Sequence, residues 1–117
     1  MADALAYLGN SLPVIYDFQQ GYEAQTITFS GNFIVVTREF YGYIVINGQS
    51  GTTGMIPFYF PGSGSWEQPS SVAVGPNGDG VTASGLNINI PQGAGGSWGH
   101  ITVVLRQSVP GLVITCS

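Results

Sequence analysis

Few residues of this chain could do chemistry, and they stand apart from one another. Residues 95–99 (GGSWG) match the spacing G-x-S-x-G, which in hydrolases places a nucleophilic serine between a strand and a helix. Here a glycine loop precedes Ser97 and a β-rich run follows it. His100, the single histidine, is too close in sequence to act as the base in the way that motif uses. We expect no catalysis here, and we place His100 at the start of a strand with its ring hydrogen-bonded.

Metal, nucleotide and glycosidase chemistry lack the residues they need. Residues 77–80 (NGDG) have Asp79 as their only acid, whereas a calcium loop needs several acidic ligands, so they indicate a surface hairpin. A zinc site needs several His or Cys residues. The glycine-rich segment 93–96 lacks the Lys-Ser/Thr of a phosphate loop. The six acids are scattered and form no glycosidase pair. The sequence predicts no enzyme, no metal and no cofactor.

Two tryptophans are candidate ligand-binding residues. Trp66 lies beside a Pro/Gly/Ser loop and Trp98 beside a glycine loop, both near Asn, Gln and Ser side chains. Aromatic rings in such loops can stack on the faces of sugars. The alternative is that both rings close the ends of the hydrophobic core, as large aromatic residues routinely do.

The composition indicates a protein that works in an assembly. Charged residues make up 7% of the 117 residues, lysine is absent, and hydrophobic residues make up 44%. Soluble proteins use surface charge to stay apart, so a chain with so little is expected to hide surface against partners. Two arginines cannot neutralise the phosphates of a nucleic acid. Neither a signal peptide nor an apolar run long enough to span a membrane is apparent.

Short strands separated by Gly/Pro turns follow one another along the chain. This pattern predicts an all-β domain, an antiparallel β-sandwich or jelly roll of about eight short strands, over residues 12–117. Residues 1–11 are expected to form an N-terminal arm or a short helical turn. Asn47-Gly48 is a hairpin signal, and Pro57 favours an edge strand or a bulge. The expected strands are 12–18, 22–29, 33–37, 41–46, 55–60, 71–74, 86–90, 101–106 and 112–115.

The clearest alternation lies in residues 86–90 (LNINI). It predicts that Leu86, Ile88 and Ile90 face the core, and that Asn87 and Asn89 face outward. The two amides are candidate interface residues. Tyr59, within residues 58–60 (FYF), is a third, since two of these rings are expected in the core and one at an interface.

In composition and strand pattern the whole chain resembles small virion proteins of tailed bacteriophages, such as head-decoration, tail or fibre-tip subunits. The resemblance implies an all-β oligomer. We expect a non-enzymatic structural subunit of a viral particle, a homo-oligomer with a trimer favoured. It would contact other virion proteins, assemble in the host cytoplasm and reside in the virion. The alternative is a carbohydrate-binding module or lectin that uses the loop aromatics, with a cell-surface glycan as partner. Cys116 is expected to be a small apolar residue ending a strand, the minority alternative being an interchain bridge.

Overall fold

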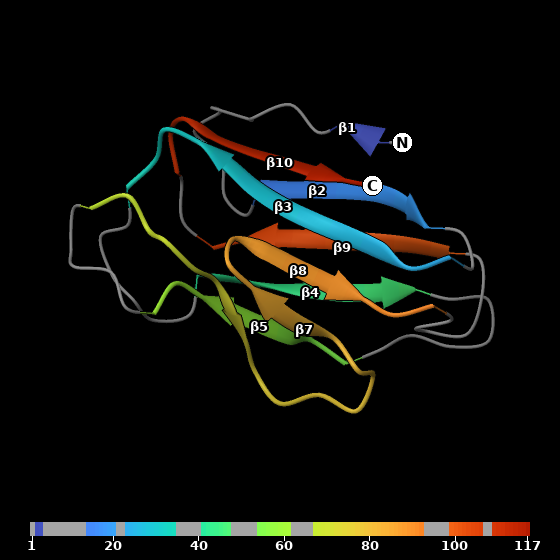
Figure 1. The fold of residues 1–117 in the computed structure, drawn as a ribbon. Coiled ribbons are helices and arrows are strands. Elements are labelled where there is room, and N and C mark those ends of the chain that lie inside the picture. Colours follow the sequence, from blue (N-terminus) through green and yellow to red (C-terminus); the bar gives the residue numbers. More distant parts are fainter. Residues whose placement is uncertain are drawn as a thin grey trace.

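The computed structural model describes residues 2–3, 14–20, 23–34, 41–47, 54–61, 67–92, 99–106 and 109–117. In these segments the chain forms ten β-strands and no helix. The strands make two antiparallel sheets that pack face to face (Figure 1). Sheet A has the order β1-β10-β3-β8-β7, and sheet B has the order β2-β9-β4-β5-β6. The strands are β1 (Ala2–Asp3), β2 (Val14–Gln20), β3 (Gln25–Gly31), β4 (Gly42–Asn47), β5 (Ile56–Tyr59), β6 (Ala73–Val74), β7 (Thr82–Ser84), β8 (Asn87–Ile90), β9 (Gly99–Leu105) and β10 (Leu112–Cys116).

The strand pairs are nested in the manner of a jelly roll. β1 pairs with β10, β2 with β9, β3 with β8 and β4 with β5, and the first three of these pairs lie alternately in sheet A and sheet B. A long antiparallel hairpin that is folded over into two layers gives this order. The two short strands β6 and β7 extend the two sheets at one side. The predicted all-β sandwich or jelly roll is therefore confirmed.

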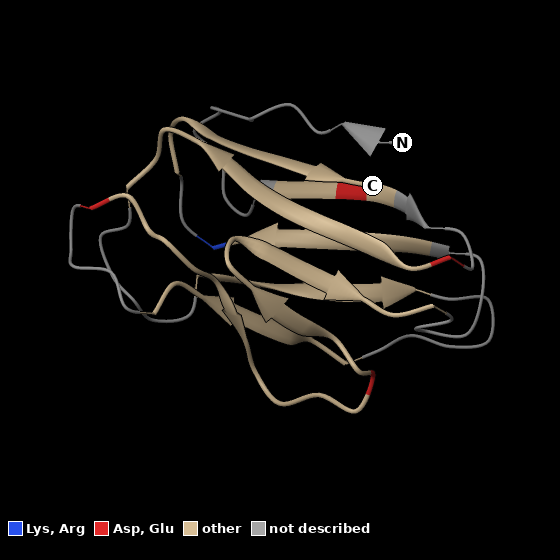
Figure 2. Cartoon of the chain, in the orientation of Figure 1, with Lys and Arg blue, Asp and Glu red and all other residues tan. Residues whose placement is uncertain are grey.

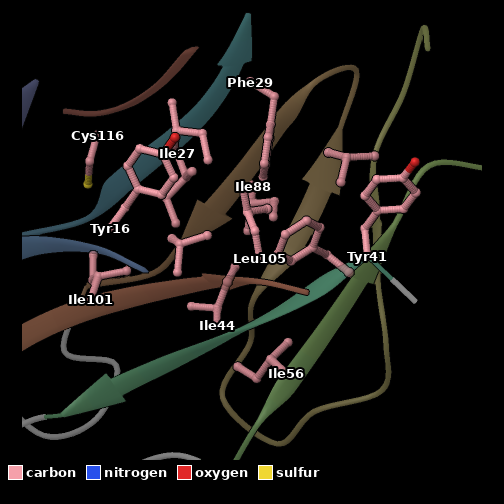
Figure 3. Close-up of a cluster of buried hydrophobic side chains, with 14 of the residues drawn as sticks. Tyr16, Ile27, Phe29, Tyr41, Ile44, Ile56, Ile88, Ile101, Leu105 and Cys116 are labelled. Atoms are coloured by element: carbon pink, nitrogen blue, oxygen red, sulfur yellow. The ribbon is translucent and has the colours of Figure 1, made fainter. Parts of the chain in front are cut away.

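Alternating residues of both sheets fill the core. Ile27 and Ile88 of sheet A face Ile44 and Leu105 of sheet B, and all four are almost completely buried (Figure 3). Aromatic rings fill one region of the core, where the ring of Phe60 packs edge-to-face on Phe29, with the ring centroids 5.6 Å apart. Ile88 and Ile90 are buried and Leu86 packs against the core, as the alternation predicts.

Two glycines allow the backbone to pass closely where the end of β3 meets the start of β10. Gly31 has φ = +92° and Gly111 has φ = +86°, a region that L side chains rarely adopt. A Cβ on Gly31 would collide with the carbonyl oxygen of Gly111, and a Cβ on Gly111 would collide with that of Asn32. Only glycine therefore allows these backbones to approach so closely.

Three local predictions need correction. Phe33 and Ile34 lie outside the strands, although Phe33 is buried, and 35–37 fall outside the described residues. The pairing of β4 with β5 ends at Ile44↔Ile56, with eleven residues between these two positions, so the register is not that of a hairpin closed by a two-residue turn at Asn47-Gly48.

Pro57 lies in β5, which is an inner strand between β4 and β6 rather than an edge strand. The Pro57 carbonyl accepts a hydrogen bond from Gly75 N at 2.8 Å, so its ring nitrogen faces the same side. β6 pairs only with Phe58 and Tyr59, so no ladder donor is needed from Pro57.

The N-terminal segment is described only in part. Ala2–Asp3 form β1, paired with the end of β10, so these two residues are a strand rather than a helical turn. The remainder of the predicted arm, residues 4–11, lies outside the described residues.

Candidate functional site

The outward surface of sheet A carries mostly hydroxyl and amide side chains, with Val113 paired with Ser30 and Asp3 paired with Thr115 at its border. In the register of the sheet, Thr115 pairs with Thr28, Thr28 with Asn87, and Asn87 with Ser84, so these residues form one line across four strands. A second line runs through Thr26, Asn89 and Thr82 in the same way. Together with Ser30, we call this set the polar face: Thr26, Thr28, Ser30, Thr82, Ser84, Asn87, Asn89 and Thr115.

The polar face keeps its hydrogen-bonding groups available to a ligand or to water. Ser30 Oγ donates weakly to the Val113 carbonyl at 3.4 Å. Within the described part of the chain, the other side chains of this set make no such bond, and none of the eight is charged. Asn87 and Asn89 therefore face outward, as predicted, with both amides free. A role for them at an interface stays a prediction.

The outward surface of sheet B is apolar over much of its area. Ile15 pairs with Val104, Val104 with Tyr43, and Tyr43 with Pro57, so that a line of apolar side chains crosses four strands. Val45 and Tyr59 also point outward on β4 and β5, by alternation with their buried neighbours. We call these six residues the apolar face: Ile15, Tyr43, Val45, Pro57, Tyr59 and Val104.

Exposure differs strongly across the apolar face. Ile15 is 58% exposed, an unusual value for isoleucine, whereas Val104 is only 6% exposed because its neighbours cover it. Tyr59 belongs to this face, while Asn87 and Asn89 belong to the polar face on the other sheet. The structure therefore divides the three predicted interface residues between two opposite surfaces.

A small polar cluster adjoins the apolar line on sheet B. His100 Nδ1 lies 3.3 Å from Asp17 Oδ1, and Thr102 Oγ1 donates to the same oxygen at 3.4 Å. His100 is the second residue of β9 and its ring is hydrogen-bonded, as predicted. Both side chains are more than half exposed, so their contact is worth little to stability. No group of three metal-ligating residues occurs within the described ranges.

The turn at residues 75–80 is organised by one side chain. Asn77 Oδ1 accepts from the backbone N–H groups of Asp79 and Val81, and Asn77 Nδ2 donates to the carbonyls of Gly75 and Val81, all within 3.0–3.1 Å. This is the turn chemistry expected of asparagine. The turn joins β6 of sheet B to β7 of sheet A, so the predicted hairpin is wrong. Residues 75–80 hold no second acid for a cation.

The remaining candidates are placed only in part. Trp66 and Trp98 lie outside the described residues, as does Ser97. Cys116 ends β10 and is buried, as predicted, with its Sγ donating to Gln25 Oε1 at 3.7 Å. Burial raises the pKa of the Cys116 thiol.

Most of the charged residues that the structure describes lie in segments that connect the strands. Glu23, Glu67 and Asp79 lie in connecting segments, and Arg106 directly follows β9 (Figure 2). Asp17 lies on β2 and Asp3 on β1. No helix in the described ranges is long and apolar enough to cross a membrane. Comparison with protein-family models, curated proteins and solved structures gives no match.

Proposed function

We propose that this protein is a non-enzymatic structural subunit of a viral particle, in capsid decoration, a tail or a fibre, that works by assembling with copies of itself. The observation that carries the proposal is the apolar face. An apolar surface that crosses four strands is typical of a protein–protein contact. Its two tyrosines suit that role, because aromatic residues are enriched at interface cores.

The distribution of charge supports assembly through this face. The chain has a net charge of -4, so two copies repel one another where their charged groups meet. Most of the described charged residues lie in connecting segments, and Asp17, two residues from Ile15 on β2, is the one that borders the apolar face. A second copy can therefore cover the apolar face with little repulsion. The Asp17–His100 pair would lie at the border of such a contact.

The fold and the composition support a place in a virion. Jelly rolls are found in viral capsid and lectin domains, although a fold alone does not fix a function. The likeness in composition and strand pattern to small phage virion proteins favours the first of these. On this proposal the protein is a homo-oligomer, with a trimer favoured, that contacts other virion proteins after assembly in the host cytoplasm.

The assembly is tested by light scattering coupled to size-exclusion chromatography over a hundredfold range of protein concentration. The double variant Ile15→Thr/Val45→Thr keeps β-branched side chains on the strands and removes apolar surface from the apolar face. We expect the wild type to be oligomeric and this variant to be shifted towards monomer. Ile34→Thr is the matched control, because Ile34 is 47% exposed but lies outside both sheets. A wild type that is monomeric throughout would refute the proposal.

The place in a virion is tested separately, by mass spectrometry of density-purified particles from the source of the gene. We expect the chain at a stoichiometry that fits a symmetric position in the particle. Its absence from such particles, with oligomerisation intact, would leave a self-assembling protein that is not a virion subunit.

Carbohydrate binding is the second candidate function. The polar face is the observation that favours it, since the tryptophans first considered for sugar stacking lie outside the described residues.

A further inference from the structure

We propose that the polar face of sheet A binds an uncharged, polyhydroxylated ligand, of which a neutral polysaccharide is the commonest kind. This site is distinct from the apolar face, which lies on the other side of the sandwich. It is also distinct from the loop tryptophans.

The first support is that the side chains of the polar face offer both hydrogen-bond donors and hydrogen-bond acceptors that are not used within the described part of the chain. A threonine or serine hydroxyl donates and accepts, and an asparagine amide offers two donors and one acceptor. Apart from Ser30, the residues of the polar face use none of this capacity on other described parts of the chain. Sugar hydroxyls also donate and accept, so a face that offers both can satisfy a polyol without leaving groups unpaired.

The second support is that these groups are held in a regular array. Residues two apart on a strand are about 6.8 Å apart, and neighbouring strands are about 4.8 Å apart. The strands are anchored from behind by Ile27, Ile88 and Ile114, all fully buried. Threonine side chains are also stiff about their first torsion. Little conformational entropy is therefore lost when a ligand binds, which favours a site formed in advance.

The third support is that the eight residues of the polar face include no charged and no aromatic side chain. None of the eight residues of the polar face is charged, although Asp3 of β1 is paired with Thr115 at the edge of the sheet, and neutral groups are cheaper to strip of water than charged ones. A protein partner is also a poor fit, because interface cores are enriched in aromatic residues, Met and Arg, and depleted in Ser. The eight residues of the polar face include none of the enriched types. A neutral polyol is the occupant that remains.

Affinity electrophoresis with soluble neutral polysaccharides tests the site. Gels that contain dextran, a β-glucan, a galactomannan or a xylan would be compared with a gel that contains anionic alginate. We expect at least one neutral polymer to retard the protein and alginate to have no effect. If alginate retards it and the neutral polymers do not, or if none of them does, the proposal is wrong.

The variant Thr28→Val/Thr115→Val locates the binding, because it removes two neighbouring hydroxyls from the polar face without changing side-chain shape. Each lost hydrogen bond is expected to weaken binding by up to about tenfold. Thr102→Val makes the same change on sheet B and serves as the control, and circular dichroism melts show that each variant folds. Retardation that survives Thr28→Val/Thr115→Val but is lost in Trp66→Ala or Trp98→Ala would place the ligand at the loops and overturn the proposal.

The size-exclusion measurement keeps this inference separate from the assembly. Loss of polysaccharide binding in Thr28→Val/Thr115→Val with an unchanged oligomeric state supports the polar face as a ligand site. Loss of the oligomer in that variant would show that the polar face is the contact between copies, and would overturn the inference.

Discussion

The substitution Ile88→Ala tests the assignment of inner and outer faces most directly. Ile88 is fully buried on β8, in register with Ile27 on one side and Ala83 on the other. The change removes three carbon atoms, worth about 0.8 kcal/mol each on burial, or about 2.4 kcal/mol in all. The partners belong to hydrogen-bonded strands and cannot fully close the space, so a cavity cost is added. We expect a total loss of about 3–4 kcal/mol, within the range of about 2–5 kcal/mol for such changes.

The neighbouring substitution Asn87→Ala is the matched control. Asn87 lies on the polar face and its side chain makes no hydrogen bond within the described residues, so the loss of this side chain should change the unfolding free energy by less than about 0.5 kcal/mol. Urea unfolding followed by tryptophan fluorescence measures both variants. If Ile88→Ala is silent and Asn87→Ala unfolds the chain, the faces are reversed and the register is wrong. Melts at two protein concentrations show whether either change acts through association.

Three further changes probe single features of the fold. Burial raises the pKa of the Cys116 thiol above its ordinary value of 9.0, so the folded state holds this proton more tightly than the unfolded one. Stability is therefore expected to fall as pH rises above about 9, and Cys116→Ala should flatten that slope in urea titrations at pH 8 to 11; an unchanged slope would contradict the assignment. Asn77→Ala removes four hydrogen bonds from its turn and should cost about 1–3 kcal/mol, with faster amide exchange at residues 79 and 81; unchanged exchange would show that the turn holds without it. Gly111→Ala should destabilise far more than Gly85→Ala in thermal melts, because both have positive φ but only Gly111 is crowded by backbone; equal losses would mean that φ alone matters.

The residues that face the core could be predicted for most strands, because the alternation that marks them is local, although β1 and β7 were not predicted as strands. The alternation in residues 86–90 places Ile88 and Ile90 in the core from a five-residue window, and the structure confirms it. The position of Cys116 at the end of a strand follows from the same kind of pattern. Turn residues also act locally, which is why Asn77 and its glycines mark a turn correctly.

The pairing of strands could not be predicted, because it depends on contacts distant in sequence. β1 is two residues long and is a strand only because it pairs with the end of β10. Asn47-Gly48 has the local signal of a hairpin, but the register of β4 with β5 begins elsewhere. The buried Phe33 resembles a strand residue in sequence and instead packs from outside the sheets.

The sequence contains a pattern that corresponds to the apolar face, but this pattern can be interpreted only once the register of the strands in sheet B is known. Residues 43–46 (YIVI) and 56–59 (IPFY) are apolar at consecutive positions, a pattern of strands covered on both sides. A single strand of this kind does not show whether the second covering comes from the same chain. The line from Ile15 to Pro57 across four strands shows that the second apolar side of these strands lies on the outward surface of sheet B.

The two faces together suggest how a weak ligand site could become effective. If copies pack through their apolar faces, every polar face points away from the contact, so one oligomer presents several identical arrays. A single array of neutral hydrogen bonds is expected to bind weakly, because each bond to a sugar replaces one to water. Several arrays on one particle can raise the apparent affinity for a long polysaccharide by about a hundredfold or more. The dissociating variant Ile15→Thr/Val45→Thr should then lose retention by polysaccharide while keeping its affinity for a short oligosaccharide, as measured by calorimetry. Equal retention of monomer and oligomer on polysaccharide would show that assembly and ligand binding are independent properties of this fold.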